Sequence, residues 1–102
     1  ASIIGWYNYL YGDNSSAKAL IKSENPEMTD EQLAYSLAKI KEYGMVVSGD
    51  SEEHGIGCIT DARWQAAYDE FVAAGLFRPG LNIKTAYTTE LVCHGLGKEL
   101  VK

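Results

Sequence analysis

Four residues with metal-binding or nucleophilic side chains fall in two pairs, His54 with Cys58 and Cys93 with His94. Imidazole nitrogens and cysteine thiolates are ligands that zinc accepts in tetrahedral sites. Two features weigh against such a site. The first pair lies in a glycine-rich segment, where a four-residue spacing does not guarantee a common face. The second pair is adjacent in sequence, so its side chains diverge by about 100° on a helix or about 180° on a strand. We therefore predict no metal site.

The same four residues contain the parts of a Cys–His nucleophilic pair. No oxyanion donor or orienting carboxylate is recognisable beside them, so we predict no catalytic residue and no cofactor, and leave any ligand-binding residues unassigned. Two cysteines are too few to indicate a disulfide framework. A single bridge between Cys58 and Cys93 would contribute roughly 3–4 kcal/mol, but we expect two free, buried thiols that pack as small hydrophobic groups.

A charged segment, "GDSEEH", places three carboxylates beside His54. Paired carboxylates with a histidine are suited to acid–base chemistry or, with a wrapped backbone, to calcium binding. The spacing of a calcium-binding EF-hand is absent, and a solvated charged loop is the better interpretation. The following "GIG" lacks the preceding strand and the third glycine of a dinucleotide-binding turn.

Two tryptophans and seven tyrosines are the remaining candidates for a binding site. Such rings can line a stacking pocket for a planar ligand. Their helical spacing favours the alternative, that they form the core.

Four helices must position these groups. The first is predicted at 1–12, ending at Gly12, with Ile3, Tyr7 and Leu10 in one apolar stripe. The second is predicted at 15–25, capped by Asp13 or Asn14, and it ends before Pro26 because the residue preceding a proline avoids the helical region.

The third helix carries the strongest local signals. Thr29 and Gln32 have the spacing of a capping box, and Met28 and Leu33 that of a hydrophobic staple. Leu33, Leu37 and Ile40 form its predicted buried stripe. Gly44 is expected to end it in the left-handed conformation.

The rest of the chain is less regular. We predict a loop at 45–60, with at most a short extended piece at 45–47. A fourth helix is predicted at 61–75, capped by Thr60 or Asp61, with Leu76 meeting Phe71 in a Schellman motif. A short helix somewhere within 83–93 and a frayed tail after Gly95 complete the prediction.

Composition narrows the function classes. The chain has 102 residues, enough for one domain, and an ordinary apolar share of 46%. Its 14 acidic and 9 basic residues give a net charge of −5, which argues against a nucleic-acid binder. It has no run of 18 apolar residues and opens without the basic segment of a signal peptide. The missing initiator methionine fits a processed chain and a piece of a longer one equally well.

A series of motifs then resembles a known family. "NPEMTDEQLAYSLAKIKEYG", followed by "SGD", "GIG", "TDARW", "FVAAGL" and "AYTTELV", is similar to the C-terminal portion of ABC-transporter solute-binding proteins. The subgroup is the one related to pyrimidine-precursor synthases of thiamine biosynthesis, with nitrate, sulfonate and taurine binders nearby. The opening "GWYNYLYGD" with "ALIK" resembles the helix that precedes this block, so the likeness spans nearly the whole chain.

The helix signals predict a mostly α fold of four to five packed helices with one long irregular loop. The resemblance implies that this is the helical C-terminal part of a bilobal α/β protein. Residues 1–102 would be a single helical domain or fragment of a non-enzymatic binding protein, periplasmic, secreted or lipid-anchored. Its implied partners are the remaining lobes, a membrane permease and a small nitrogen- or sulfur-containing solute. The alternatives are a segment of a pyrimidine-precursor synthase and a stand-alone helical interaction module.

Overall fold

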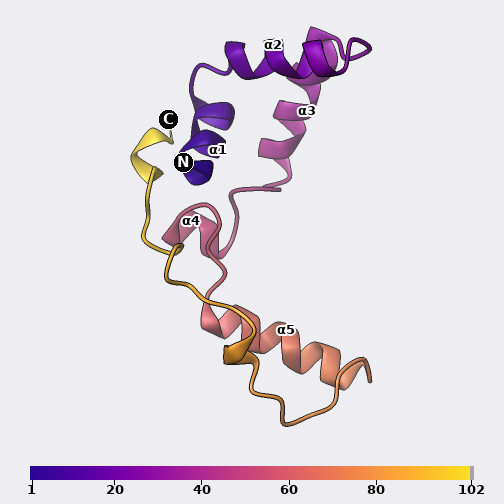
Figure 1. The fold of residues 1–102 in the computed structure, drawn as a ribbon, viewed down its shortest axis with the longest axis vertical. Helices are drawn as coiled ribbons and strands as arrows, with labels where there is room; N and C mark the ends of the chain where they lie inside the picture. Colours follow the sequence, from indigo (N-terminus) through magenta and orange to yellow (C-terminus); the bar gives the residue numbers. More distant parts are fainter. Residues whose placement is uncertain (102) are drawn as a thin grey trace.

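The computed structural model describes residues 1–101 and is mostly helical, as predicted (Figure 1). No strand occurs among these residues. The elements in chain order are α1 (Ser2–Tyr11), α2 (Ser15–Glu24), α3 (Asp30–Glu42), α4 (Asp50–His54), α5 (Asp61–Ala73) and two short 3-10 helices, η1 (Ile83–Thr85) and η2 (Lys98–Leu100).

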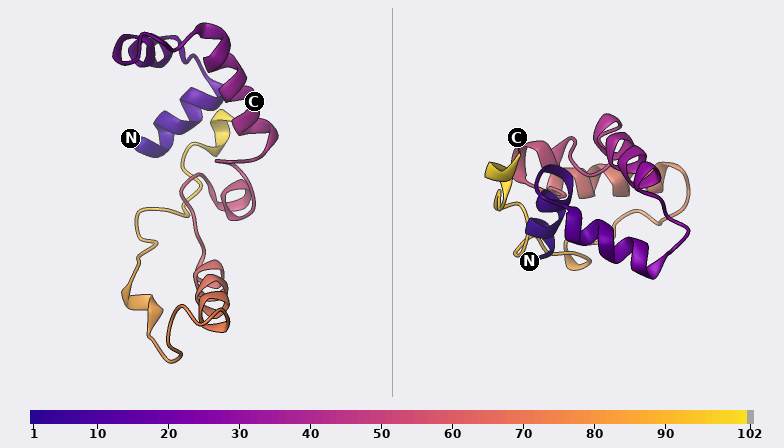
Figure 2. Two further views of the ribbon diagram at one scale, coloured as in Figure 1. Left: turned by 90° about the vertical axis from the view of Figure 1, so that its right-hand side faces the viewer. Right: turned by 90° about the horizontal axis from the view of Figure 1, so that it is seen from above.

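The molecule is elongated, measuring 49 × 30 × 23 Å. Its radius of gyration is 17.2 Å, whereas a compact domain of about 100 residues has a value near 13 Å. Helices α1, α2, α3 and η2 gather at one end, and α5 with η1 forms the other end (Figures 1 and 2). Two chain segments, one containing 55–60 and one containing 86–97, connect the ends. The chain therefore forms two helical units joined by a narrow waist.

The core lies in the unit that contains α1. Tyr7, which is completely buried, clusters with Leu10 of the same helix and with Ile56 from the segment after α4. The Ile56 amide donates a hydrogen bond to the Tyr7 hydroxyl oxygen at 3.0 Å, across 49 residues of sequence. Leu33 and Cys58 are the other buried hydrophobic residues among those described. This core is small for a chain of this length.

The ends of α3 match the predictions. The Gln32 amide donates to the Thr29 hydroxyl at 3.1 Å, and the Thr29 amide donates to the Gln32 side-chain oxygen at 2.9 Å, which completes the capping box. At the other end Gly44 has φ +57°, and the Met45 amide reaches the Ile40 carbonyl at 3.0 Å. Both termini are thus fixed by local hydrogen bonds.

The predicted apolar stripe of α3 faces the core. Leu33 is buried, and Leu37 and Ile40 are partly buried against the cluster around Tyr7. The stripe attaches α3 to α1.

Loss of the α3 cap should be measurable. We expect Thr29→Ala to lower the free energy of unfolding by about 1 kcal/mol, because the backbone amide of Gln32 loses its acceptor, the Thr29 hydroxyl. Thr29→Ser keeps a hydroxyl acceptor and should stay close to wild type. Urea denaturation of the three proteins measures both values, and equal losses in the two variants would contradict the capping role.

The other helix boundaries follow their predicted signals. Helix α1 ends at Gly12 and α2 ends at Asn25. The Asp13 carboxylate accepts from the Ser15 amide at 3.0 Å, whereas the Asn14 side chain donates to the Tyr9 carbonyl and makes no cap.

Helix α5 begins at the Thr60 cap, whose hydroxyl accepts from the Arg63 amide. It ends with the predicted Schellman bond from the Leu76 amide to the Phe71 carbonyl at 2.9 Å.

The predicted loop at 45–60 is wrong in part, because it contains α4, and 45–47 is not extended. Ser51 organises this helix: its hydroxyl accepts from the Ser48 amide at 2.8 Å and lies 3.1 Å from the Val46 carbonyl. Three carboxylates lie in the first turn, where the helix dipole favours negative charge.

One of the two C-terminal predictions is corrected. A short helix does form within 83–93, the 3-10 helix η1, but residues 96–101 are not a frayed tail, because Lys98–Leu100 form η2 against α1. Gly97 is buried against the Tyr7 ring, and Leu100 packs on the core cluster. These tertiary contacts replace the frayed end that the local sequence indicates.

Candidate functional site

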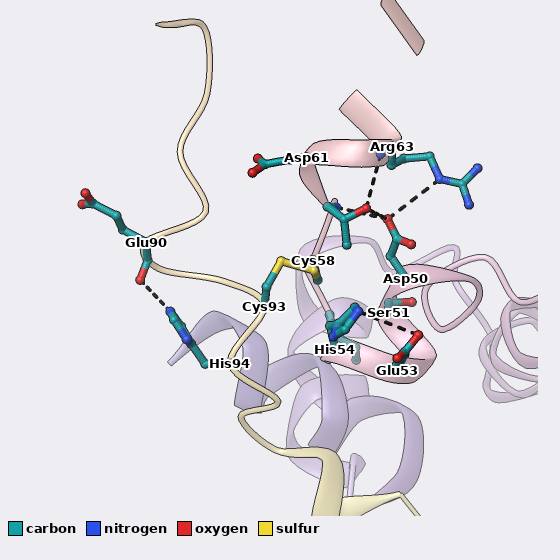
Figure 3. Close-up of a disulfide and its surroundings, with 12 residues drawn as sticks. Asp50, Ser51, Glu53, His54, Cys58, Asp61, Arg63, Glu90, Cys93 and His94 are labelled. Carbon is teal, nitrogen blue, oxygen red and sulfur yellow. Dashed lines mark hydrogen bonds and ion pairs between the residues drawn. A yellow bond between two sulfur atoms is a disulfide. The ribbon is translucent and has the colours of Figure 1, made fainter. Parts of the chain in front are cut away.

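Cys58 and Cys93 form a disulfide at the waist of the molecule, so the prediction of two free thiols is wrong (Figure 3). Their Cα atoms are 4.6 Å apart. The bond joins the two segments that run between the helical units, and the Gly95 amide donates to the His54 carbonyl at 2.9 Å beside it. Both sulfur atoms are bonded to each other and serve neither as thiolate ligands nor as nucleophiles in this state.

The two histidines lie near this bond, His54 four residues before Cys58 and His94 directly after Cys93. Ring nitrogen Nε2 of His94 is 2.8 Å from the Glu90 carbonyl oxygen, and Nε2 of His54 is 3.8 Å from a Glu53 carboxylate oxygen. Both rings line a cavity of about 240 Å³ next to Cys93. The fold thus gathers the four residues of the zinc hypothesis. Within residues 1–101, however, no group of three or more His, Cys, Asp or Glu side chains is arranged to hold a metal.

Asp50 is the most constrained carboxylate of the charged segment. Its Oδ2 accepts from the Thr60 amide at 3.1 Å and from the Thr60 hydroxyl at 2.8 Å, and it lies 3.8 Å from Nε of Arg63. The hydrogen bonds from Thr60, aided by the nearby Arg63, lower the pKa of Asp50 below its ordinary value. Asp50 therefore ties α4 to the start of α5.

This hydrogen bonding predicts an acid-sensitive contribution to stability. Because the pKa of Asp50 is lower in the folded state, its contribution is complete above the ordinary aspartate pKa, and it is lost as the pH falls through the folded value. Asp50→Asn should show a shallower fall in unfolding free energy between pH 5 and pH 2.5. Glu52→Gln removes a charge from the same helix without touching Thr60 and should keep the wild-type slope. Denaturation curves across this pH range measure both, and an unchanged slope in Asp50→Asn would contradict the assignment.

Aromatic side chains organise the α5 unit. Trp64 stacks on Tyr87 with ring centroids 4.6 Å apart and planes 12° from parallel. The Tyr87 hydroxyl donates to Asp61 at 2.7 Å, and this bond raises the pKa of Tyr87. The Tyr68 hydroxyl donates to the Arg78 carbonyl at 2.7 Å and accepts from the Leu81 amide. These contacts hold the segment 78–87, which follows α5, against that helix.

An apolar concavity lies between α1, α2 and α3. It has a volume of about 660 Å³ and is lined by Ser2, Gly5, Trp6, Tyr9, Ala17, Leu20, Ile21 and Ile40. Trp6 is 45% exposed here and meets Tyr9 edge-on, with ring centroids 6.4 Å apart. No charged side chain lines this groove, so it suits an apolar surface better than an ionic ligand.

The prediction that the aromatic residues form the core is only partly correct. Tyr7 is fully buried, but Trp6, Tyr35 and Tyr43 are exposed. The rings of Tyr35 and Tyr43 lie 5.8 and 5.4 Å from the Lys39 amine. Helical spacing correctly places them on helix faces, but it does not say which faces this chain covers.

No known protein family, curated protein or solved structure matches this chain. The functional proposal therefore rests on the motif series in the sequence and on the surfaces described above. No helix within residues 1–101 combines the length and apolar character needed to cross a bilayer.

Proposed function

We propose that the chain is the helical C-terminal segment of the substrate-binding component of an ABC importer. Its solute would be a small organic compound containing nitrogen or sulfur. The observation that carries the proposal is the ordered motif series, from "NPEMTDEQLAYSLAKIKEYG" to "AYTTELV", which resembles that family along nearly the whole chain. Its role is non-enzymatic: it supports the lobes that hold the solute.

The distribution of exposed apolar side chains fits a segment that packs against other lobes. Exposed large hydrophobic side chains occur on both helical units and on the segments between them: Trp6, Leu20, Tyr35, Tyr43, Met45, Ile59, Phe71, Leu76, Phe77, Leu81, Leu91, Leu96 and Val101. Contiguous exposed apolar surface marks a site of interaction with another protein surface. In the proposal the remaining lobes of the same protein cover part of it, and a membrane permease is the second partner.

The construction of α3 fits the same role. Its capping box and Schellman motif let it form from local signals, and its apolar stripe is directed to the core. A helix with locally fixed ends can position a neighbouring part of the protein, and this role requires no reactive side chains. The solute contacts themselves would lie mainly in the lobes that precede this segment.

The disulfide supports the proposed location. Such bonds persist in oxidising compartments, which include the bacterial periplasm and the cell exterior. A periplasmic, secreted or lipid-anchored protein meets this condition.

A thermal-shift screen of the full-length protein against pyrimidines, sulfonates and nitrate tests the proposal. Binding to the folded state raises the melting temperature, and a ligand at 100 times its Kd contributes about 2.7 kcal/mol. We expect one of these classes to raise it reproducibly. No response to any class would count against the proposal, and iron-dependent formation of a pyrimidine product would favour the synthase alternative.

A further inference from the structure

We propose that the Cys58–Cys93 disulfide is a redox-sensitive latch that holds residues 94–101, here called the strap, against α1. Opening the bond would release the strap and uncover Tyr7 while α3 remains folded. This regulatory behaviour is independent of which solute the protein binds.

Apart from the covalent link, the strap is held by the packing of Gly97 and Leu100 on the α1 core and by two hydrogen bonds to α4. Gly97 lies against the ring of Tyr7 and the Cδ1 methyl group of Ile4. The Gly95 amide donates to the His54 carbonyl, and the Lys98 amine donates to the Glu53 carbonyl. Lys98 is exposed at this position, so water competes for its bond.

The strap contributes few side chains to the hydrophobic core. Among the partly buried hydrophobic residues packed on the Tyr7 cluster, only Leu100 belongs to the strap, and the others are Ile3, Tyr9, Tyr11, Leu37, Ile40, Val46 and Val47. These seven lie in α1, in α3 and just after α3. These residues attach α3 to α1 without the strap, so release of the strap should leave that attachment in place.

The link begins at a residue in an uncommon conformation. Cys93 has φ +65°, the only positive φ at a non-glycine residue in the described chain. A side chain with a Cβ holds this left-handed conformation at an energetic cost. Opening the bond removes the covalent constraint that keeps Cys93 in it, so the strap gains freedom at its first residue.

The bond is also accessible from one side. Cys58 is buried, but Cys93 is only partly buried and lines the 240 Å³ cavity between the strap and His54. A dithiol reductant can attack Sγ of Cys93 as a thiolate, forming a mixed disulfide and expelling the Cys58 thiolate, which takes up a proton. The second thiol of the reductant then forms its own internal disulfide and releases Cys93. The reductant is oxidised by two electrons and the protein gains two thiols.

Hydrogen exchange in the full protein, read by mass spectrometry before and after dithiothreitol, tests the latch. Peptides from 94–101 should exchange at least ten-fold faster after reduction, since the amides of Gly95, Lys98 and Leu100 lose the geometry of their hydrogen bonds. Peptides within Asp30–Glu42 should change less than two-fold. Labelling of the two thiols confirms that the bond has opened.

The double variant Cys58→Ser/Cys93→Ser provides the control. It should show fast exchange in the strap without reductant and no response to dithiothreitol; if it does not fold, the reduced wild-type protein gives the same comparison. A strap that stays protected after reduction would overturn the proposal, because the non-covalent contacts would then suffice. Equal loss of protection in the strap and in α3 would overturn it too, since the bond would then stabilise the whole molecule and not the strap alone.

Discussion

Tyr7→Ala is expected to lower the free energy of unfolding by about 3–5 kcal/mol, the range for removing a buried aromatic side chain. Tyr7 is the only large side chain among the described residues that is completely buried. It contacts Leu10, Ile56 and the strap, so its loss leaves a cavity where three parts of the chain meet. Urea denaturation followed by circular dichroism measures the change.

Two further variants test the contribution of the Tyr7 hydroxyl and the effect of removing a tyrosine from an exposed position. Tyr7→Phe keeps the ring but leaves the Ile56 amide without its acceptor, which should cost about 1–3 kcal/mol. Tyr35→Ala removes the same residue type from an exposed position and should stay within about 0.5 kcal/mol of wild type. A Tyr7→Ala loss no larger than that of Tyr35→Ala would contradict the placement of the core.

Gly97→Ala is expected to cost about 2–4 kcal/mol, the sum of left-handed strain and overpacking. Gly97 has φ +86°, and a Cβ at this position would lie 2.6 Å from Cδ2 of Tyr7 and 3.0 Å from Cδ1 of Ile4. The buried ring cannot move aside freely, so the strap must shift. The same denaturation experiment measures the loss.

Gly75→Ala is the matched control for Gly97→Ala. Gly75 also has a positive φ, +76°, but a Cβ there meets nothing within 4 Å. It should therefore carry only the conformational cost of about 1–2 kcal/mol. Equal losses at the two glycines would show that the strap does not pack on Tyr7 as described.

Features decided by neighbouring residues could be predicted from the sequence. The Thr29–Gln32 capping box, the Gly44 terminus and the bond from Leu76 to Phe71 each depend on residues within a few positions of one another. Their hydrogen-bond geometry is dictated by that local spacing. The buried stripe of α3 could also be predicted, because a helical period identifies which residues share a face.

Features decided by distant contacts were missed. The disulfide joins positions 35 apart, and nothing local to Cys58 or Cys93 indicates that the fold brings them together. An even number of cysteines was the one available signal. In the same way, η2 is held by Gly97 and Leu100 on α1, a contact that no local pattern in the tail contains.

The candidate site shows the same division. The sequence analysis weighed His54, Cys58, Cys93 and His94 as one set and rejected it, whereas the fold brings them together at the waist, as a disulfide with two histidines near it. Asp50 was expected on a solvated loop, whereas Thr60, ten residues away, binds its carboxylate. Residue types alone did not show which of these side chains meet, because that depends on tertiary contacts.

We propose that the exposed apolar side chains of both helical units pack against further lobes of the same protein. Sedimentation velocity of the isolated 102-residue chain, compared with the full-length protein, tests it most directly. We expect the isolated chain to self-associate through these faces or to sediment as an expanded particle, and the full-length protein to sediment as a compact monomer. An isolated chain that sediments as a compact monomer would contradict this packing and favour a stand-alone helical module.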